Sequence, residues 1–201
     1  MINFNGQITA DLNKISIHNR GFSYGDSVFE TCKYSAGKLL FWEDHYFRLM
    51  ASMRIMRMEI PMNFTMEFLE NEIEKTLIKN ELSNKTARVK LTVFRDEGGL
   101  YKPTSKTVGY VISVHELDTD FYLMNDSLYE VDLFKDFYVS PSLLSTLKTN
   151  NKAINVVGSV YAEENSLQNA LLLNTDKKSG RGFEWESISS KRIYHKNTTT
   201  F

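Results

Sequence analysis

The chain has 201 residues, of which 42% are hydrophobic, enough to form one large or two small packed domains. Its formal net charge of −1 gives no reason to expect nucleic acid or an anionic membrane as a partner. The single cysteine, Cys32, excludes an internal disulfide framework. None of the four histidines lies at a ligand-type spacing from another histidine or from Cys32, so we expect no metal site.

The N-terminal segment alternates apolar and polar residues and lacks the basic-then-apolar pattern of a signal peptide. No stretch is long enough to span a bilayer, and we therefore expect a cytoplasmic protein. Residues 2–17 predict a short hairpin with its turn at Asn5-Gly6. Arg20 to Asp26 carries two glycines among aromatic residues, which predicts a backbone that turns tightly near something buried.

Strands and helices follow in alternation. Val28–Tyr34 and Lys38–Trp42 predict two strands joined by a three-residue turn. Glu43-Asp44 then opens a helix, because acidic side chains favour the positive end of the helix dipole. The apolar face of this helix is predicted to comprise Tyr46, Leu49, Met50, Met53 and Met56. A second amphipathic helix, capped by Thr65, is predicted at 63–80, and two more strands at 87–94 and 107–117.

The remaining chain begins with a polar stretch that has the character of an interdomain connection, at 118–126. A new strand pattern occupies 127–134, and a short buried strand is predicted at 170–173. Between them lies a predicted helix whose inward face consists of Ile154, Val157, Val160 and Tyr161.

Lys148 lies between a turn-like entry and this amphipathic run. A lysine amine that is desolvated at the mouth of a pocket loses its proton more readily, and the neutral amine can condense with an aldehyde to form a Schiff base. Most lysines are instead solvated surface groups. Taken alone, the position of Lys148 leaves both interpretations open.

Two other stretches contain candidate binding residues. His45 and Arg48 lie one helical turn apart and project from one side of the helix. The planar guanidinium of Arg48 could bind a phosphate, or it could form a surface ion pair with Glu43 or Asp44. The loop after residue 94 could likewise carry binding groups or only connect two strands.

Taken together, five stretches resemble the class IV aminotransferase family, the fold type IV enzymes that use pyridoxal 5'-phosphate. The order and spacing of these stretches are more specific than any one of them. They are RGFSYGDSVFET (20–31), HYFRL (45–49), the loop 95–103, LKTNN (147–151) and ALLLN (170–174).

This resemblance implies an α/β fold with a small N-terminal domain at 1–117, a linker at 118–126 and a partial C-terminal cofactor domain at 127–178. The cofactor would lie in the cleft between the domains, and a homodimer would complete the cleft. In the family, the lysine that matches Lys148 carries the cofactor, and the arginine that matches Arg48 binds its phosphate. The released lysine then moves the proton at the substrate's α-carbon.

The stretches RDEGGLYKP and LKTNN resemble those of 4-amino-4-deoxychorismate lyases, which release pyruvate and 4-aminobenzoate for folate synthesis. We therefore expect an aminodeoxychorismate substrate, with an amino acid as the alternative. Branched-chain aminotransferases usually show a glycine pair and a tyrosine after the lysine, where this chain has residues 150–152, NNK. The candidate substrate-binding residues are Phe29, Arg95 and Tyr101.

Two alternatives to the lyase remain. D-amino-acid aminotransferases share the strand pattern at Val28–Glu30 but commonly have a tyrosine at the position of Phe29. An amino-acid aminotransferase of the D-amino-acid or branched-chain type is therefore one alternative, and an inactive truncated family member is the other.

The tail after Lys178, residues 179–201, departs from the family pattern. Arg181 stands where the family places a glutamate that faces the pyridine nitrogen, and a cation there would oppose protonation of the ring. If Lys177 and Lys178 are encoded by AAA AAA, a one-base shift with suitable codons turns the tail into VVEALNGNLFLLKEF, which resumes the pattern. We hypothesise a frameshift that truncates the C-terminal domain; a divergent terminus is the alternative.

Overall fold

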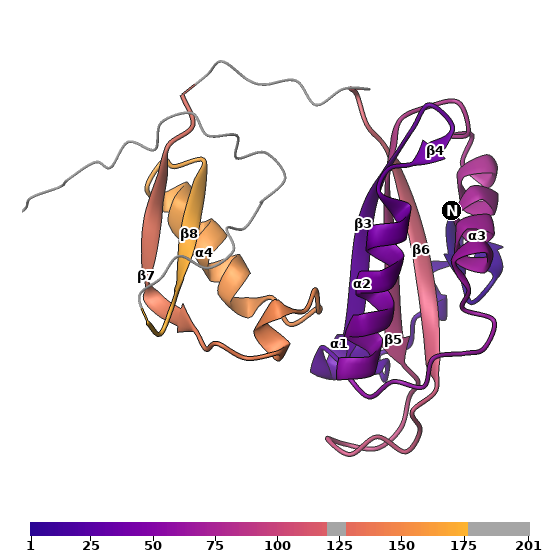
Figure 1. The fold of residues 1–201 in the computed structure, drawn as a ribbon, viewed down its shortest axis with the longest axis horizontal. Coiled ribbons are helices and arrows are strands. Elements are labelled where there is room, and N and C mark those ends of the chain that lie inside the picture. Colours follow the sequence, from indigo (N-terminus) through magenta and orange to yellow (C-terminus); the bar gives the residue numbers. More distant parts are fainter. Residues whose placement is uncertain (120–127, 177–201) are drawn as a thin grey trace, which may run out of the picture. The chain divides into compact units, whose positions relative to one another are not determined.

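The computed structural model describes residues 1–119 and 128–176, which form two compact units (Figure 1). The first unit contains the described residues up to 119 together with Leu147–Asn151, and the second contains the other described residues. The mixed α/β class is confirmed. The Lys148 segment, which the sequence assigned to the C-terminal domain, belongs to the first unit. Most of the predicted linker and the whole of the tail at 179–201 lie outside the described residues.

An antiparallel six-stranded sheet forms the framework of the first unit, in the order β2-β1-β6-β5-β3-β4. Its strands are β1 Ile2–Phe4, β2 Gln7–Thr9, β3 Ser27–Ser35, β4 Lys38–Leu39, β5 Ala87–Arg95 and β6 Val108–Glu116. The predicted hairpin is confirmed as β1 and β2, and its turn residues Asn5 and Gly6 both have positive φ. It is shorter than expected, because a 3-10 turn at Leu12–Lys14 follows β2.

The helices of this unit are α1 Arg20–Tyr24, α2 Trp42–Ile55 and α3 Met66–Lys79. Helix α2 packs along β3, and α3 packs on β6 and β1 (Figure 1). The predicted strand at Lys38–Trp42 is wrong beyond Leu39, because Phe41 adopts a left-handed φ of 54° and Trp42 already begins α2. Glu43 and Asp44 lie in the first turn of α2, as their charge predicts.

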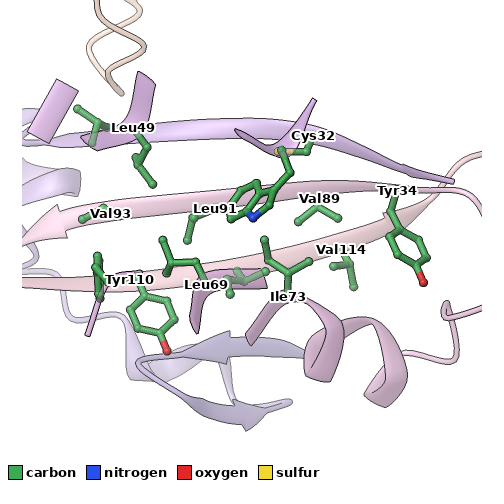
Figure 2. Packing of buried hydrophobic residues seen from close by; sticks show 14 of the residues in the cluster. Cys32, Tyr34, Leu49, Leu69, Ile73, Val89, Leu91, Val93, Tyr110 and Val114 are labelled. Carbon is green, nitrogen blue, oxygen red and sulfur yellow. The ribbon is translucent and has the colours of Figure 1, made fainter. Parts of the chain in front are cut away.

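Both long helices cover the same face of the sheet, and the core lies between them and the strands. Figure 2 shows Val89, Leu91 and Val93 of β5 lined up along this core, with Leu49 of α2 and Leu69 of α3. Because side chains alternate along a strand, Phe29 and Thr31 of β3 lie on the opposite face of the sheet and are only half-buried.

The second unit consists of β7 Val131–Val139, α4 Ala153–Glu164 and β8 Asn169–Asn174, with a 3-10 turn at Leu144–Thr146. Strands β7 and β8 pair in parallel, and a small core forms around Phe134, Ala162, Ala170 and Leu172. In the described residues, no helix has both the length and the apolar character needed to cross a membrane.

The predicted inward face of α4 is wrong in part. Val157 and Val160 are exposed, while Gly158 and Ala162 are the buried residues of the helix. Small residues allow α4 to approach the strands closely, so the face that packs inward is offset from the one that the larger side chains suggested.

Removing the cap of α3 should have a modest and measurable effect. The Thr65 hydroxyl accepts a hydrogen bond from the Phe68 amide at 3.1 Å. Thr65→Ala should therefore lower the free energy of unfolding by about 1 kcal/mol in urea titrations. Thr65→Ser keeps the acceptor and should stay within about 0.5 kcal/mol of the wild type. Equal losses in the two variants would contradict a capping role.

Candidate active site

The Lys148 segment extends the sheet at the end of β3. Thr149 forms a bridge with Val28, the Phe29 amide donates to the Lys148 carbonyl at 2.9 Å, and the Asn150 amide donates to the Ser27 carbonyl at 3.3 Å. This pairing places Lys148 across from Phe29, and the Lys148 Nζ lies 5.4 Å from the centroid of the Phe29 ring. A lysine on a paired segment beside an aromatic ring has a defined position.

A second lysine shares this aromatic ring. The Nζ of Lys90, on β5, lies 4.6 Å from the Phe29 ring centroid. Burial lowers the pKa of Lys90, and the positive charges of Arg88 and Lys148 lower it further. Phe29 therefore interacts with two cations, and Lys90 is an amine that the sequence did not single out.

Glu30 of β3 has the most buried ionised side chain of the cluster, with an exposed fraction of 1%. Its two carboxylate oxygens accept hydrogen bonds from Arg48 Nε at 2.7 Å and Arg48 Nη2 at 2.5 Å. His45 Nδ1 lies 2.9 Å from the second oxygen. The Arg48 guanidinium is thus fixed in a bidentate pair, which is the strongest geometry available to this group.

The charges around Glu30 determine its protonation. Burial raises the pKa of its carboxyl, but the hydrogen bonds from Arg48 and His45 and the charges of Arg48 and Lys148 outweigh burial, so the pKa is lowered overall. The hydrogen bond to Glu30 in turn raises the pKa of Arg48. Glu30 is therefore a carboxylate at neutral pH, and it interacts with both predicted cofactor residues.

Arg48 retains a hydrogen-bonding edge. Its side chain is 45% exposed, and no residue in the described part of the chain accepts a hydrogen bond from its Nη1. The hydrogen-bonded partner is Glu30, on the neighbouring strand, and neither Glu43 nor Asp44. A guanidinium that is fixed on one edge and open on another can bind an anion such as a phosphate.

The three candidate substrate residues differ in their surroundings. Phe29 contacts Lys148, as described above. Arg95 is buried, and it donates from Nε to Asp26 at 2.9 Å and from Nη2 to the Met56 carbonyl at 2.6 Å. Tyr101 is exposed, and its ring meets that of Tyr24 edge-on, with centroids 5.9 Å apart. The structure thus brings Phe29 to the lysine, whereas the contacts given for Arg95 and Tyr101 are with other groups.

Glu30 is the site residue that the sequence analysis missed. It shares the helix-covered face of β3 with Val28 and Cys32, which are both buried. A carboxylate within an apolar alternation needs a charged partner, because an unpaired buried charge is costly. That position in the pattern was the available signal.

The described residues contain no group of three or more His, Cys, Asp and Glu side chains that could hold a metal ion. Their chemical assets are an amine at Lys148 and a guanidinium at Arg48, both of which interact with Glu30. The amine suits an aldehyde, and the guanidinium suits a phosphate.

Comparison with known proteins agrees with this chemistry. The family model for amino-transferase class IV matches residues 27–179. A D-alanine aminotransferase of Listeria monocytogenes is 27% identical over 167 residues, which are 78% of this chain and 52% of the relative. The chain therefore spans about half the length of the curated relatives it matches.

Solved structures share the fold. The branched-chain aminotransferase of Escherichia coli matches with a TM-score of 0.76 and 20% identity over 90% of this chain and 62% of its own. A candidate 4-amino-4-deoxychorismate lyase of Legionella pneumophila matches with a TM-score of 0.70 and 18% identity over 89% and 62%. The match of the family model to most of the sequence is decisive: this chain belongs to the class IV aminotransferase family.

Proposed function

We propose that the protein is a pyridoxal 5'-phosphate-dependent enzyme in which Lys148 binds the cofactor covalently and Arg48 binds its phosphate. The observation that carries the proposal is the fixed position of Lys148 on the edge of β3, where it pairs with the residue next to the Glu30 that holds Arg48. Two other solved branched-chain aminotransferases of the same fold, at 19% and 20% identity, contain pyridoxamine 5'-phosphate or a phosphopyridoxyl derivative of L-glutamate.

The donor groups fit this cofactor. When bound, pyridoxal 5'-phosphate supplies an aldehyde that reacts with an amine and a pyridine ring that acts as an electron sink. Lys148 offers the amine, and the Nη1 edge of Arg48 offers donors for the phosphate. Glu30 keeps the guanidinium oriented, because two of its nitrogens are already bonded to the carboxylate.

The same residues would act on the substrate. The amine of Lys148, once free, takes up and returns the proton at the substrate's α-carbon. Phe29 provides an apolar surface beside this amine, which limits the positions that a substrate can occupy. These steps use only groups whose positions the first unit fixes.

For the reaction, 4-amino-4-deoxychorismate lyase is our first candidate. Its support is the likeness of RDEGGLYKP and LKTNN to the lyase stretches and the shared fold of the Legionella pneumophila protein. The glycine pair in the first stretch has a structural cause as well. Gly99 has a φ of 74°, and a Cβ there would lie 2.1 Å from the Lys102 carbonyl oxygen. The specific part of this likeness is therefore in Leu100 to Pro103.

An amino-acid aminotransferase is the second candidate. The 27% identity to a D-alanine aminotransferase favours an activity on D-amino acids. The branched-chain type has structural likeness alone as support, at 20% identity. The two reactions share the cofactor and Lys148, so the same site would serve either one.

The test is to add pyridoxal 5'-phosphate, reduce with borohydride and map the modified lysine by peptide mass spectrometry. We expect modification at Lys148. A lyase should then release pyruvate and 4-aminobenzoate in equal amounts from aminodeoxychorismate without an amino acceptor. An aminotransferase should require a 2-oxo acid. Absence of modification at Lys148 would refute the proposal and would indicate an inactive relative.

We also propose that the protein is a cytoplasmic homodimer, as its family resemblance implies. Exposed apolar side chains on α1 and on the loop after β5 support an association surface, in particular Phe22, Leu100 and Tyr101. Measurement of the molar mass in solution by light scattering would test the assembly.

A further inference from the structure

Asp26 lies between α1 and β3 and holds two buried arginines. Its Oδ2 accepts a hydrogen bond from Arg20 Nε and another from Arg95 Nε, both at 2.9 Å. Arg20 and Arg95 are 3% and 6% exposed. Two guanidinium groups this far from water depend on a counter-charge, and Asp26 supplies it to both.

The two arginines connect Asp26 to other parts of the first unit. Arg20 Nη1 donates to the carbonyls of Gly98, Gly99 and Leu100, at 3.1, 3.3 and 2.6 Å. Arg95 donates to the carbonyls at 56 and 57, where α2 ends, at 2.6 and 3.2 Å. One carboxylate thus joins the loop after β5, the end of α2 and the beginning of β3.

The residues that follow Asp26 are the ones that hold the Lys148 segment. Ser27 accepts the hydrogen bond from the Asn150 amide, and the Phe29 amide donates to the Lys148 carbonyl. Just before Asp26, a Cβ on Gly25 would lie 3.3 Å from the Asn151 Cβ, so this turn also lies against the segment. A change in the path of the chain at Asp26 would therefore move the backbone to which Lys148 is bonded.

We propose that Asp26 is a positioning residue for Lys148, acting through Arg20 and Arg95 on the turn that leads into β3. The inference rests on the proposed function, since it concerns the reactivity of the cofactor lysine. It assigns Arg95 a role in positioning in addition to the substrate contact that the sequence predicted. Precise placement matters, because a reacting amine displaced by about 1 Å can lose on the order of 10²-fold in rate.

The test compares Asp26→Asn with the wild type in two measurements. The first is amide hydrogen exchange, read at Phe29 and Asn150, which donate the two hydrogen bonds that hold the segment. The second is the rate of covalent attachment of pyridoxal 5'-phosphate to Lys148, as a function of cofactor concentration. Asp96→Asn is the matched control, because Asp96 directly follows Arg95 but its side chain accepts from the Thr107 hydroxyl.

In Asp26→Asn we expect faster exchange at Phe29 and Asn150, with exchange of the core amide of Leu91 unchanged. Attachment at saturating cofactor should slow by about 10-fold or more, because the amine is misplaced. The half-saturating concentration should change by less than about 2-fold, because Arg48 and its bond to Glu30 are retained. Asp96→Asn should match the wild type in both measurements.

Unchanged exchange at Phe29 and Asn150 would overturn the proposal, as would faster exchange there with an unchanged attachment rate. If Asp26→Asn also loses protection at Leu91, Arg20→Lys replaces it, because lysine keeps the charge beside Asp26 but loses the fork to the loop carbonyls. The same outcomes then decide the proposal. If the wild type itself attaches no cofactor, the proposed function fails, and the exchange measurement still tests whether Asp26 orders the segment.

Discussion

Lys148→Ala should abolish covalent capture of pyridoxal 5'-phosphate and lower any lyase or aminotransferase activity by about 10³-fold or more. The variant removes both the amine that binds the cofactor and the group that moves the substrate's α-proton. Its backbone hydrogen bonds to β3 do not depend on the side chain, so the first unit should keep its stability. The measurements are borohydride trapping with peptide mapping, turnover of aminodeoxychorismate, and urea unfolding.

Lys90→Ala is the matched control for this experiment. Lys90 contacts the same Phe29 ring, and its lowered pKa makes a larger share of its amine neutral, so it is the competing nucleophile near Lys148. In Lys90→Ala, modification should remain at Lys148. Trapping that persists at Lys90 in the Lys148→Ala variant with full activity would refute the assignment of Lys148.

The strands and helices of the first unit could be predicted because local patterns and tertiary packing agree there. The turn at Asn5-Gly6 and the cap at Thr65 follow from local chemistry alone, and the structure confirms both. The boundary at Phe41 could not be predicted in this way, since its left-handed backbone is unusual for a bulky residue. Tertiary context decides such positions.

The candidate site shows the same division. Lys148 and Arg48 were found by spacing and by family likeness, and these reveal the type of residue but not its partner. The pairing of Arg48 with Glu30 joins a helix to a strand 18 positions away, and local periodicity contains no information on such contacts. The buried bonds of Arg95 to Asp26 are likewise nonlocal, at a separation of 69 positions.

Replacement of Glu30 should have the largest effect on stability among the charged residues of the site. Glu30→Gln keeps the size of the side chain but removes the charge that pairs with Arg48 and His45. Loss of one partner of a buried ion pair typically costs about 3–5 kcal/mol, and the partial exposure of Arg48 reduces the expected loss to about 2 kcal/mol. Because the guanidinium also loses its orientation, cofactor affinity should fall by about 10-fold.

Glu116→Gln is the matched control, because the Glu116 carboxylate pairs with Lys85 on the surface, where both side chains are exposed. Its loss should stay below about 0.5 kcal/mol. Equal stability of the two variants in urea unfolding would refute the role given to the Glu30 pair.

The stability difference between the wild type and Glu30→Gln should also depend on pH. The folded-state pKa of Glu30 lies below its unfolded value, so the unfolded state binds a proton first as the pH falls. The contribution of the pair is therefore complete above the ordinary glutamate range, at about pH 5 and higher, and is lost as the pH falls through the lowered pKa. Because other carboxylates remain the same in the two proteins, their difference isolates Glu30. A difference that is constant from about pH 7 down to about pH 3 would mean that the carboxylate is not ionised in the folded protein, and that Arg48 is held by some other group.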